Sequence, residues 1–469
     1  MWKKSGFCST VGATKLSTEE PQKPMPAILP FLLCLQSEVT MTTIRQFSHI
    51  ALAILAMTGR VTMLGISRWS GDGASYRTVQ RFFATVLPWA TLFWLFFRTH
   101  LFERDDVYLL AGDETIVTKA GKHTPGLDRF FASLYGKPVP GLAFFALSLI
   151  SIKQRHSFPI AVEQVVRTAE EKAATQSQAS KPATKRKPGR PKGESSKAKT
   201  APELSAELSR IQKLILSLLE RIGGLLPLTY LVLDGHFGNA GAFELAQSCK
   251  LHLISKLRSD SALYLPYDGP YAGRGPKRIY GHKLNPRAIP DQYLHHTHVE
   301  KGIERCTYQF QARHKTFAQP LNVVCIVKTN LKTHSQAHVL LFSSDLALEC
   351  DNLVDHYCLR FQLEFNFRDA KQYWGLEDFM TIHPTRLTNA ANLALFMVNV
   401  VERVLRDRRH TQPEISVLDL KAQCRGAKYV EATIKLLPER PEPGLLNQIV
   451  TQVIGIGRIH ATPAEPIPV

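Results

Sequence analysis

Two apolar runs that each end in an aspartate place the strongest constraint on how this chain can fold. Leu228–Asp234 reads LTYLVLD, and Asp106–Asp113 reads DVYLLAGD. Both have the length and the nearly unbroken apolar character of a strand that is buried on both faces of a sheet. Strand patterns at Gly141–Lys153 and Phe158–Val166, and an amphipathic helical pattern at Leu204–Ile222, lie between the two runs. The order of these elements predicts an α/β fold in which two strands of the central sheet end in an aspartate.

A third acidic residue lies in a stretch whose charged side chains share one face of a helix. Residues 357–371 read YCLRFQLEFNFRDAK, and we expect a single helix whose N-cap is Asp351 or Asn352. At about 100° per residue, one arc roughly 80° wide holds Tyr357, Arg360, Glu364, Arg368 and Lys371. Apolar side chains flank this arc on both sides, which favours a strip that lines a cleft. A surface helix with intrahelical ion pairs, each worth about a few tenths of a kcal/mol, has a similar pattern.

The spacing of four residues in this stretch resembles a family signature. Tyr357, Arg360, Glu364 and Lys371 match the Tyr-x2-Arg-x3-Glu-x6-Lys signature of bacterial insertion-sequence DDE transposases of the insertion sequence 4 type. The resemblance implies a ribonuclease H-like mixed sheet with a β-rich insertion, preceded by a helical N-terminal domain. In such a sheet, the first and fourth strands of the pattern lie side by side.

The resemblance also implies a catalytic site. Asp113, Asp234 and Glu364 would form a catalytic triad that binds two Mg²⁺ ions, for which Mn²⁺ could substitute. Hard divalent ions prefer oxygen ligands and keep positions open for phosphate and water. Two ions about 4 Å apart can activate a water or 3′-hydroxyl and stabilise the leaving 3′-oxygen. An aspartate at a strand end often only caps a turn, so the prediction depends on all three residues together.

The same resemblance assigns DNA contacts to the expected helix. Tyr357 and Arg360 would bind the phosphates next to the cut, and Lys371 would bind the DNA backbone. Arg368 shares their arc and is a further candidate for DNA binding. Some relatives cut through a hairpin intermediate and hold a flipped base with a tryptophan from the β-rich insertion. Residues 258–348, the predicted insertion, contain no tryptophan, so the hairpin step stays open.

The charge of the chain favours a polyanionic partner. Its formal net charge is +18 and its pI is about 9.5, which indicates nucleic acid first and an anionic membrane surface second. The eight cysteines form no CxxC pair, which disfavours a zinc ribbon and fits a reducing cytosol. The most apolar run, Phe82–Phe97, is interrupted by Pro88 and is too short to span a bilayer. Charge alone does not choose between these two partners, but the resemblance implies a protein of the bacterial cytoplasm, associated with the nucleoid, that binds double-stranded DNA and no membrane.

The N-terminal part of the chain divides into two predicted segments. Residues 1–41 are expected to be a disordered extension, and residues 42–104 a helical DNA-binding domain. Within this domain, Ser75–Phe83 fits the last helix of a helix-turn-helix, with Arg77 and Arg81 on its exposed face. A helical cap with scattered surface arginines has the same pattern.

A basic linker is predicted inside the catalytic domain. Residues 170–202 are rich in Ala, Ser, Lys and Pro and lack aromatic residues, so we expect them to be disordered. Pro188–Lys192 reads PGRPK and resembles a minor-groove AT-hook, in which Arg190 would enter the groove. A solvated basic loop that adds nonspecific phosphate affinity is the alternative.

The predicted catalytic domain comprises residues 105–257 and 349–405. Residues 258–348 form the β-rich insertion, and residues 406–469 a C-terminal helical region and tail. The resemblance implies a transposase that binds transposon ends as a homodimer and catalyses DNA cleavage and strand transfer in cut-and-paste transposition. The alternatives are a ribonuclease H-like nuclease without strand transfer and a non-catalytic DNA-binding protein descended from a transposase.

Overall fold

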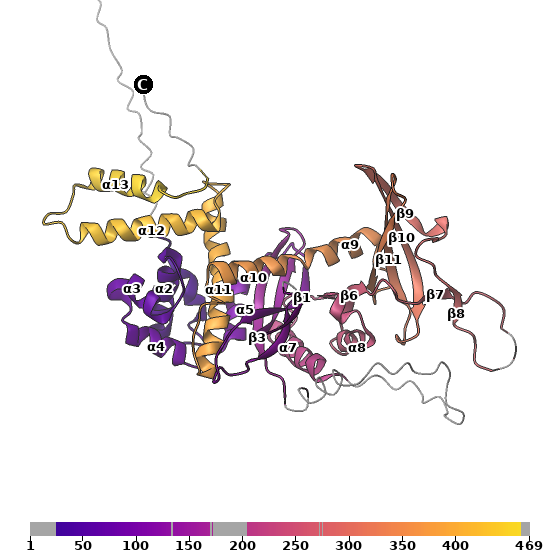
Figure 1. Cartoon of the computed structure of the whole chain (residues 1–469). Coiled ribbons are helices and arrows are strands. Elements are labelled where there is room, and N and C mark those ends of the chain that lie inside the picture. Colours follow the sequence, from indigo (N-terminus) through magenta and orange to yellow (C-terminus); the bar gives the residue numbers. More distant parts are fainter. Residues whose placement is uncertain are drawn as a thin grey trace, which may run out of the picture.

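Helices near the N-terminus form one end of the molecule (Figure 1). The computed structural model describes residues 25–132, 135–168, 171, 204–271, 273 and 275–460. The helices at this end are α1 (Ile28–Leu32), the 3₁₀ helix η1 (Leu33–Leu35), α2 (Met41–Ala56), α3 (Met63–Ser70), η2 (Gly71–Gly73), α4 (Tyr76–Ala84) and α5 (Trp89–His100). Side-chain oxygens of Thr40, Thr62 and Ser75 accept backbone N–H groups at the starts of α2, α3 and α4. These N-caps explain where the three helices begin.

Part of the predicted N-terminal extension is folded. The expectation that residues 1–41 are disordered is wrong for residues 25–41, because α1 and η1 bury Ile28, Leu32 and Leu35 completely. Residues 1–24 lie outside the described residues, as does all of the predicted linker except residue 171, and with it Arg190.

Within the described residues, twelve strands form one mixed sheet. The elements of its first part are β1 (Tyr108–Thr118), β2 (Asp128–Ala132), β3 (Lys137–Ser151), β4 (His156–Val165), α7 (Ala206–Ile222), β5 (Tyr230–Leu233), η3 (Gly235–Phe237), α8 (Ala240–Ser248) and β6 (His252–Leu257). The strand order here is β2-β3-β1-β5-β6, and β4 pairs with β3. β1 is antiparallel to β3 and parallel to β5. The two apolar runs that end in aspartate are therefore neighbours, as expected.

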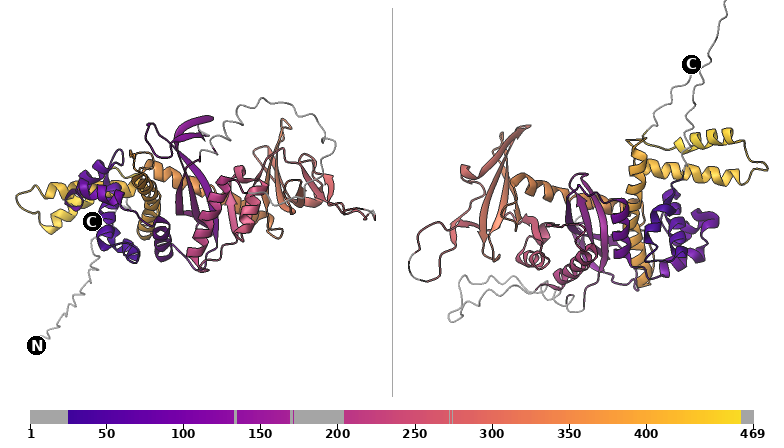
Figure 2. Two further views of the ribbon diagram at one scale, coloured as in Figure 1. Left: turned by 90° about the horizontal axis from the view of Figure 1, so that it is seen from below. Right: turned by 180° about the vertical axis from the view of Figure 1, so that it is seen from behind.

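The insertion between β6 and the next helix extends the same sheet. Its elements are β7 (Leu263–Pro266), β8 (Tyr280–Lys283), η4 (Asp291–Tyr293), β9 (Leu294–Glu300), β10 (Ile303–His314), β11 (Leu321–Asn330) and β12 (Gln336–Ser343). β12 is antiparallel to β6, with Leu340 opposite Leu257. The insertion strands lie at the end of the molecule opposite to the N-terminal helices (Figures 1 and 2).

Five helices follow the sheet: α9 (Cys350–Leu359), α10 (Gln362–Gln372), α11 (Pro384–Arg409), α12 (Val417–Ile434) and α13 (Pro443–Gly455). α11 contacts β4 on one side and α4 and α5 on the other, so it joins the N-terminal helices to the sheet. Phe396 of α11 packs its ring against those of Phe47 and Phe93, with centroids 5.1 and 5.2 Å away. Among the described helices, none alone has the length and apolar character to cross a membrane, although α4 and α5, bent by 100°, meet that test as a pair.

Candidate functional site

Asp113 lies inside β1 and not at its end. The strand continues from Glu114 to Thr118, where it pairs with β3, so the expected strand end is wrong. Gly112, opposite Leu233 of β5, is the last position paired between the two parallel strands. A Cβ atom at Gly112 would lie 2.7 Å from the ring of Phe145. Any larger residue at this position would therefore collide with that ring. The next residue on each strand is an aspartate, so Asp113 and Asp234 follow the paired region side by side.

Asp234 directly follows β5 and begins the 3₁₀ helix η3. Its Oδ1 accepts the backbone N–H of His236 at 3.1 Å, and its backbone oxygen accepts the hydroxyl of Ser255 at 2.6 Å. These bonds fix the turn that follows the strand. Its carboxylate is partly exposed and therefore retains acceptor capacity.

The expected single helix over residues 357–371 is two helices. α9 begins at Cys350 with Glu349 as N-cap, not Asp351 or Asn352, and ends at Leu359. α10 begins at Gln362. Between them, backbone hydrogen bonds run three residues back, from the N–H groups of Leu363 and Glu364, which is the tighter 3₁₀ pattern. The break lies at Arg360 and Phe361.

Arg360 at this break connects two of the three predicted catalytic carboxylates. Its Nη1 donates to Oδ2 of Asp113 at 2.5 Å, and its Nη2 lies 3.7 Å from Oε1 of Glu364. The Arg360 and Asp113 side chains are only 13 % and 20 % exposed, whereas Glu364 is half exposed. The guanidinium carbon also lies 6.0 Å from the ring centroid of Tyr357. Residues far apart in the sequence thus meet around one guanidinium.

The charges of these residues influence one another. Burial raises the pKa of Asp113, the Arg360 guanidinium opposes this rise, and the charges of Asp234 and Glu364 add to it. Burial also raises the pKa of the Tyr357 phenol, with Arg360 again opposing and Asp234 adding. The three carboxylates therefore share one electrostatic environment with Arg360 and Tyr357, as groups within several ångströms of each other do.

A family model described as DDE superfamily endonuclease matches residues 34–316, more than half of the 469-residue chain. The chain belongs to the DDE superfamily endonucleases. The matched region includes Asp113 and Asp234 and ends before Glu364, so Glu364 rests on the signature spacing and on its position beside Arg360. DNA is the substrate that an endonuclease of this superfamily implies. No curated protein matches the chain.

DDE superfamily endonucleases typically use divalent metals, and the carboxylates of this endonuclease offer the oxygen donors that such ions prefer. No three His, Cys, Asp or Glu side chains in the described ranges lie close enough together to hold a metal ion. The guanidinium of Arg360 lies between Asp113 and Glu364. The carboxylates suit a divalent cation by their chemistry, but in this structure they do not gather around one point, and Arg360 provides the positive charge between Asp113 and Glu364.

The other predicted DNA-binding residues of the endonuclease lie in different surroundings. Lys371 donates to the backbone oxygen of Ile116 at 2.8 Å and lies 3.4 Å from Glu377, so its amine faces β1. Arg368 is half exposed and pairs with its neighbour Asp369. Arg77 and Arg81 are exposed on α4, as expected, in the N-terminal helical part.

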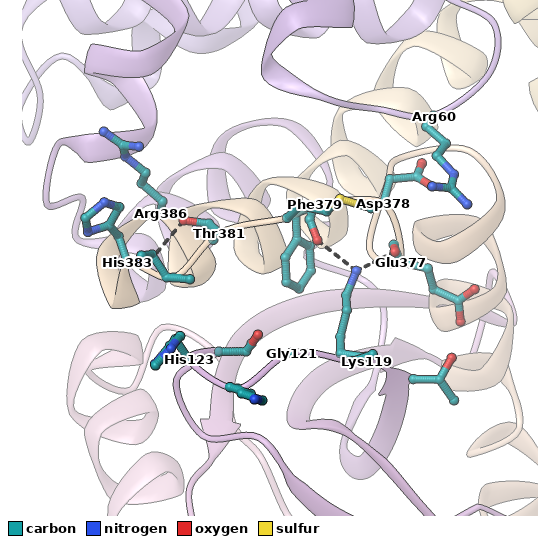
Figure 3. A pocket seen from close by; sticks show the side chains of 16 residues that line it. Arg60, Lys119, Gly121, His123, Glu377, Asp378, Phe379, Thr381, His383 and Arg386 are labelled. Carbon is teal, nitrogen blue, oxygen red and sulfur yellow. Dashed lines mark hydrogen bonds between the residues drawn. The ribbon is translucent and has the colours of Figure 1, made fainter.

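Sequence reasoning missed a groove beside the far end of β1. It has a volume of about 940 Å³ and is lined by Arg60, by residues 118–124 and by residues 377–383 with Arg386 (Figure 3). Lys119 reaches across it and donates to the backbone oxygens of Glu377 and Phe379 at 2.6 and 2.8 Å. No local pattern could have predicted this groove, because its walls come from three distant segments.

Proposed function

We propose that this DDE superfamily endonuclease is a transposase of the insertion sequence 4 type, which binds transposon ends and catalyses cut-and-paste transposition. One observation supports this most: Asp113 in β1 and Asp234 after β5 come directly after the stretch in which these two parallel strands pair, and Arg360 joins Asp113 to Glu364. The placement of two aspartates on neighbouring strands, with a helix carrying the glutamate, is what a ribonuclease H-like catalytic site requires.

In this proposal, Asp113, Asp234 and Glu364 bind two Mg²⁺ ions, or Mn²⁺ in their place. The bound ions would activate the attacking water or 3′-hydroxyl and stabilise the leaving 3′-oxygen. Arg360 and Tyr357 border the carboxylates, so they are positioned to hold the phosphate at the cut. Lys371 and Arg368, farther along α10, would contact the DNA backbone on one side of the cut.

The N-terminal helices would provide a second DNA contact. Arg77 and Arg81 project from α4, whose opposite face buries Val79, Phe82 and Phe83. An exposed basic face on a helix that follows another short helix is compatible with groove binding. Because two ends must be joined, we propose a homodimer in the complex with DNA.

The test is divalent-metal-dependent cleavage of DNA that carries the natural flanks of the gene. The unaltered protein is compared with Glu364→Gln and with the control Glu349→Gln, which removes the same charge from the exposed start of α9. We expect Glu364→Gln to bind the flanks but to cut them more than about a hundredfold more slowly. Loss of a residue that only orients a metal ligand already costs about 10–100-fold, and the control should cut normally.

The products separate the alternatives. Cuts at both flanks, with 3′-hydroxyl ends that join to a second duplex, identify a transposase. Cutting without joining identifies a nuclease, and binding without cutting identifies a non-catalytic DNA-binding protein. Normal cleavage by Glu364→Gln would refute the catalytic assignment. Light scattering of the complex with end fragments measures whether two copies of the protein are present.

A further inference from the structure

Two apolar side chains are exposed in the groove beside β1. Met380 and Ile382 are 79 % and 61 % exposed, and both lie in the segment between α10 and α11 that lines the groove. Their neighbour Phe379 is almost buried and lies beneath the amine of Lys119, 4.4 Å from its ring centroid. The segment is therefore anchored through Phe379, while Met380 and Ile382 remain available to a ligand.

The groove carries a net positive charge, because Arg60, Lys119, Lys122 and Arg386 outnumber Glu377 and Asp378 among its lining residues. The side chains of Arg60, Lys122 and Arg386 make no hydrogen bond or ion pair with a residue that the structure describes. The two acidic residues of the groove have protein partners. Glu377 lies 3.4 Å from Lys371, and Asp378 accepts the backbone N–H of Val61 at 2.9 Å. Figure 3 shows Arg60 and Arg386 toward opposite ends of the groove.

The contact between Asp378 and Val61 also holds the walls of the groove together. Gly375 has a φ of +83°, and a Cβ atom there would lie 2.4 Å from that of Val61. The loop after α2, which carries Arg60, thus packs closely against the segment after α10. Positive charge from the N-terminal part and apolar side chains from the catalytic part therefore face the same space.

The distance from the groove to the catalytic carboxylates follows from β1, which carries residues of both. Asp113 and Thr118 are five positions apart on this strand, or about 17 Å at about 3.3 Å per residue. This is the length of about five base pairs of duplex DNA at about 3.4 Å each. One duplex can therefore reach both places.

We propose that this groove binds the DNA duplex about five base pairs from the cleaved phosphate. Arg60, Lys122 and Arg386 contact phosphates, and Met380 and Ile382 enter the duplex as an apolar wedge at one base step. Proteins that kink DNA often insert Met, Ile, Leu or Phe between base pairs and surround the wedge with cations. The distance to the cut rests on the proposed function, whereas the binding of DNA in the groove does not.

The first experiment measures how the affinity of the full chain for duplex DNA depends on salt. Each lost phosphate contact lowers the slope of log affinity against log salt by about 0.9. We expect Arg60→Gln/Arg386→Gln to lower the slope by about 2. Lys332→Gln/Arg440→Gln, which removes the same charge from exposed positions outside the groove, should leave it unchanged. Equal slopes for the two double variants would refute binding in the groove.

The second experiment places 2-aminopurine at each of the first eight base pairs on either side of the cut. In the Glu364→Gln background, we expect fluorescence to rise about five base pairs from the cut, because unstacking relieves quenching. Met380→Ser/Ile382→Ser should abolish the rise, and the control Leu436→Ser, at another exposed apolar residue, should keep it. The absence of a rise at every position would refute the wedge. If Arg60→Gln/Arg386→Gln lowers the salt slope as expected but the unaltered protein does not cut DNA, binding of DNA in the groove stands and the proposed function is refuted.

Discussion

Replacing Arg360 by methionine removes the guanidinium that joins Asp113 to Glu364 and retains most of the aliphatic side chain. The bond to Asp113 is short, and both side chains are largely buried. Removing one partner of a buried ion pair costs about 3–5 kcal/mol, because the other charge stays buried and unpaired. The half-exposed contact with Glu364 adds at most about 1 kcal/mol. Because the site is partly open to solvent, we expect Arg360→Met to lower the free energy of unfolding by about 3 kcal/mol without metal.

The same change should strengthen metal binding. If a cation binds between the carboxylates, Arg360 must release Asp113 first, and the metal affinity is reduced by the free energy of that contact. A contact of about 3 kcal/mol corresponds to about a hundredfold in affinity, since about 1.4 kcal/mol is a factor of ten. We therefore expect Arg360→Met to bind Mn²⁺ about a hundredfold more tightly than the unaltered protein does. Saturating Mn²⁺ should then restore most of the lost stability.

Calorimetric titration with Mn²⁺ and urea denaturation with and without the ion measure both effects. The control is Arg155→Met, because Arg155 forms a two-bond ion pair with Asp355 of α9 that is largely exposed. Exposed pairs contribute about 1 kcal/mol or less, so this variant should keep its stability and its Mn²⁺ affinity. Unchanged Mn²⁺ binding by Arg360→Met would show that Arg360 does not compete with the ion, and weaker binding would show that Arg360 supports the metal site. Either result would refute the reasoning.

Two predictions concern helices that hold the site in place. Asn389→Leu should lower the free energy of unfolding by about 3–5 kcal/mol, measured by urea denaturation, because buried Asn389 accepts from the indole of Trp89 and donates to backbone oxygens at the end of α4. Asn392→Leu should lower the free energy of unfolding much less, since buried Asn392 Oδ1 has no partner in the described residues. An equal loss of stability in the two variants would contradict this account. Burial lowers the pKa of Lys421 to about 8, so between pH 8 and about 10.5 the unfolded chain holds a proton that the folded protein has released. Stability should rise with pH by about 3 kcal/mol across this window, and Lys421→Met should lose this rise; a rise of equal size in both proteins would exclude Lys421 as its source.

The sequence predicted the strands around the site better than the position of Asp113 within its strand. Unbroken apolar runs mark strands buried on both faces, and both β1 and β5 contain such a run. Beyond Asp113, β1 changes to alternating burial, because only one face of that segment is covered. The acidic pair Asp113 and Glu114 interrupts the apolar pattern, so the sequence indicates a strand end where pairing with β3 in fact continues.

The structural features that we did not predict from the sequence depend on tertiary contacts. The side-chain pattern of residues 357–371 is helical throughout, and nothing in it marks the break at Arg360. The break becomes visible only in the backbone hydrogen bonds, where Arg360 reaches Asp113 on β1. The groove was even less predictable from the sequence than this break. Arg60, Lys119 and Met380 come from three segments that only the folded chain brings together.

β1 connects the proposed catalytic carboxylates to the groove through a series of cationic side chains. Arg360 contacts Asp113, Lys371 binds the backbone oxygen of Ile116, and Lys119 at the end of the strand binds the segment after α10. Each of these cations already has a partner within the protein, so none is free to bind DNA without giving up a contact. The side chains of Arg60, Lys122 and Arg386 in the groove differ, because they have no hydrogen-bond or ion-pair partners among the described residues. DNA should therefore bind first through the groove, and release of Arg360 from Asp113 would follow when the scissile phosphate reaches the carboxylates.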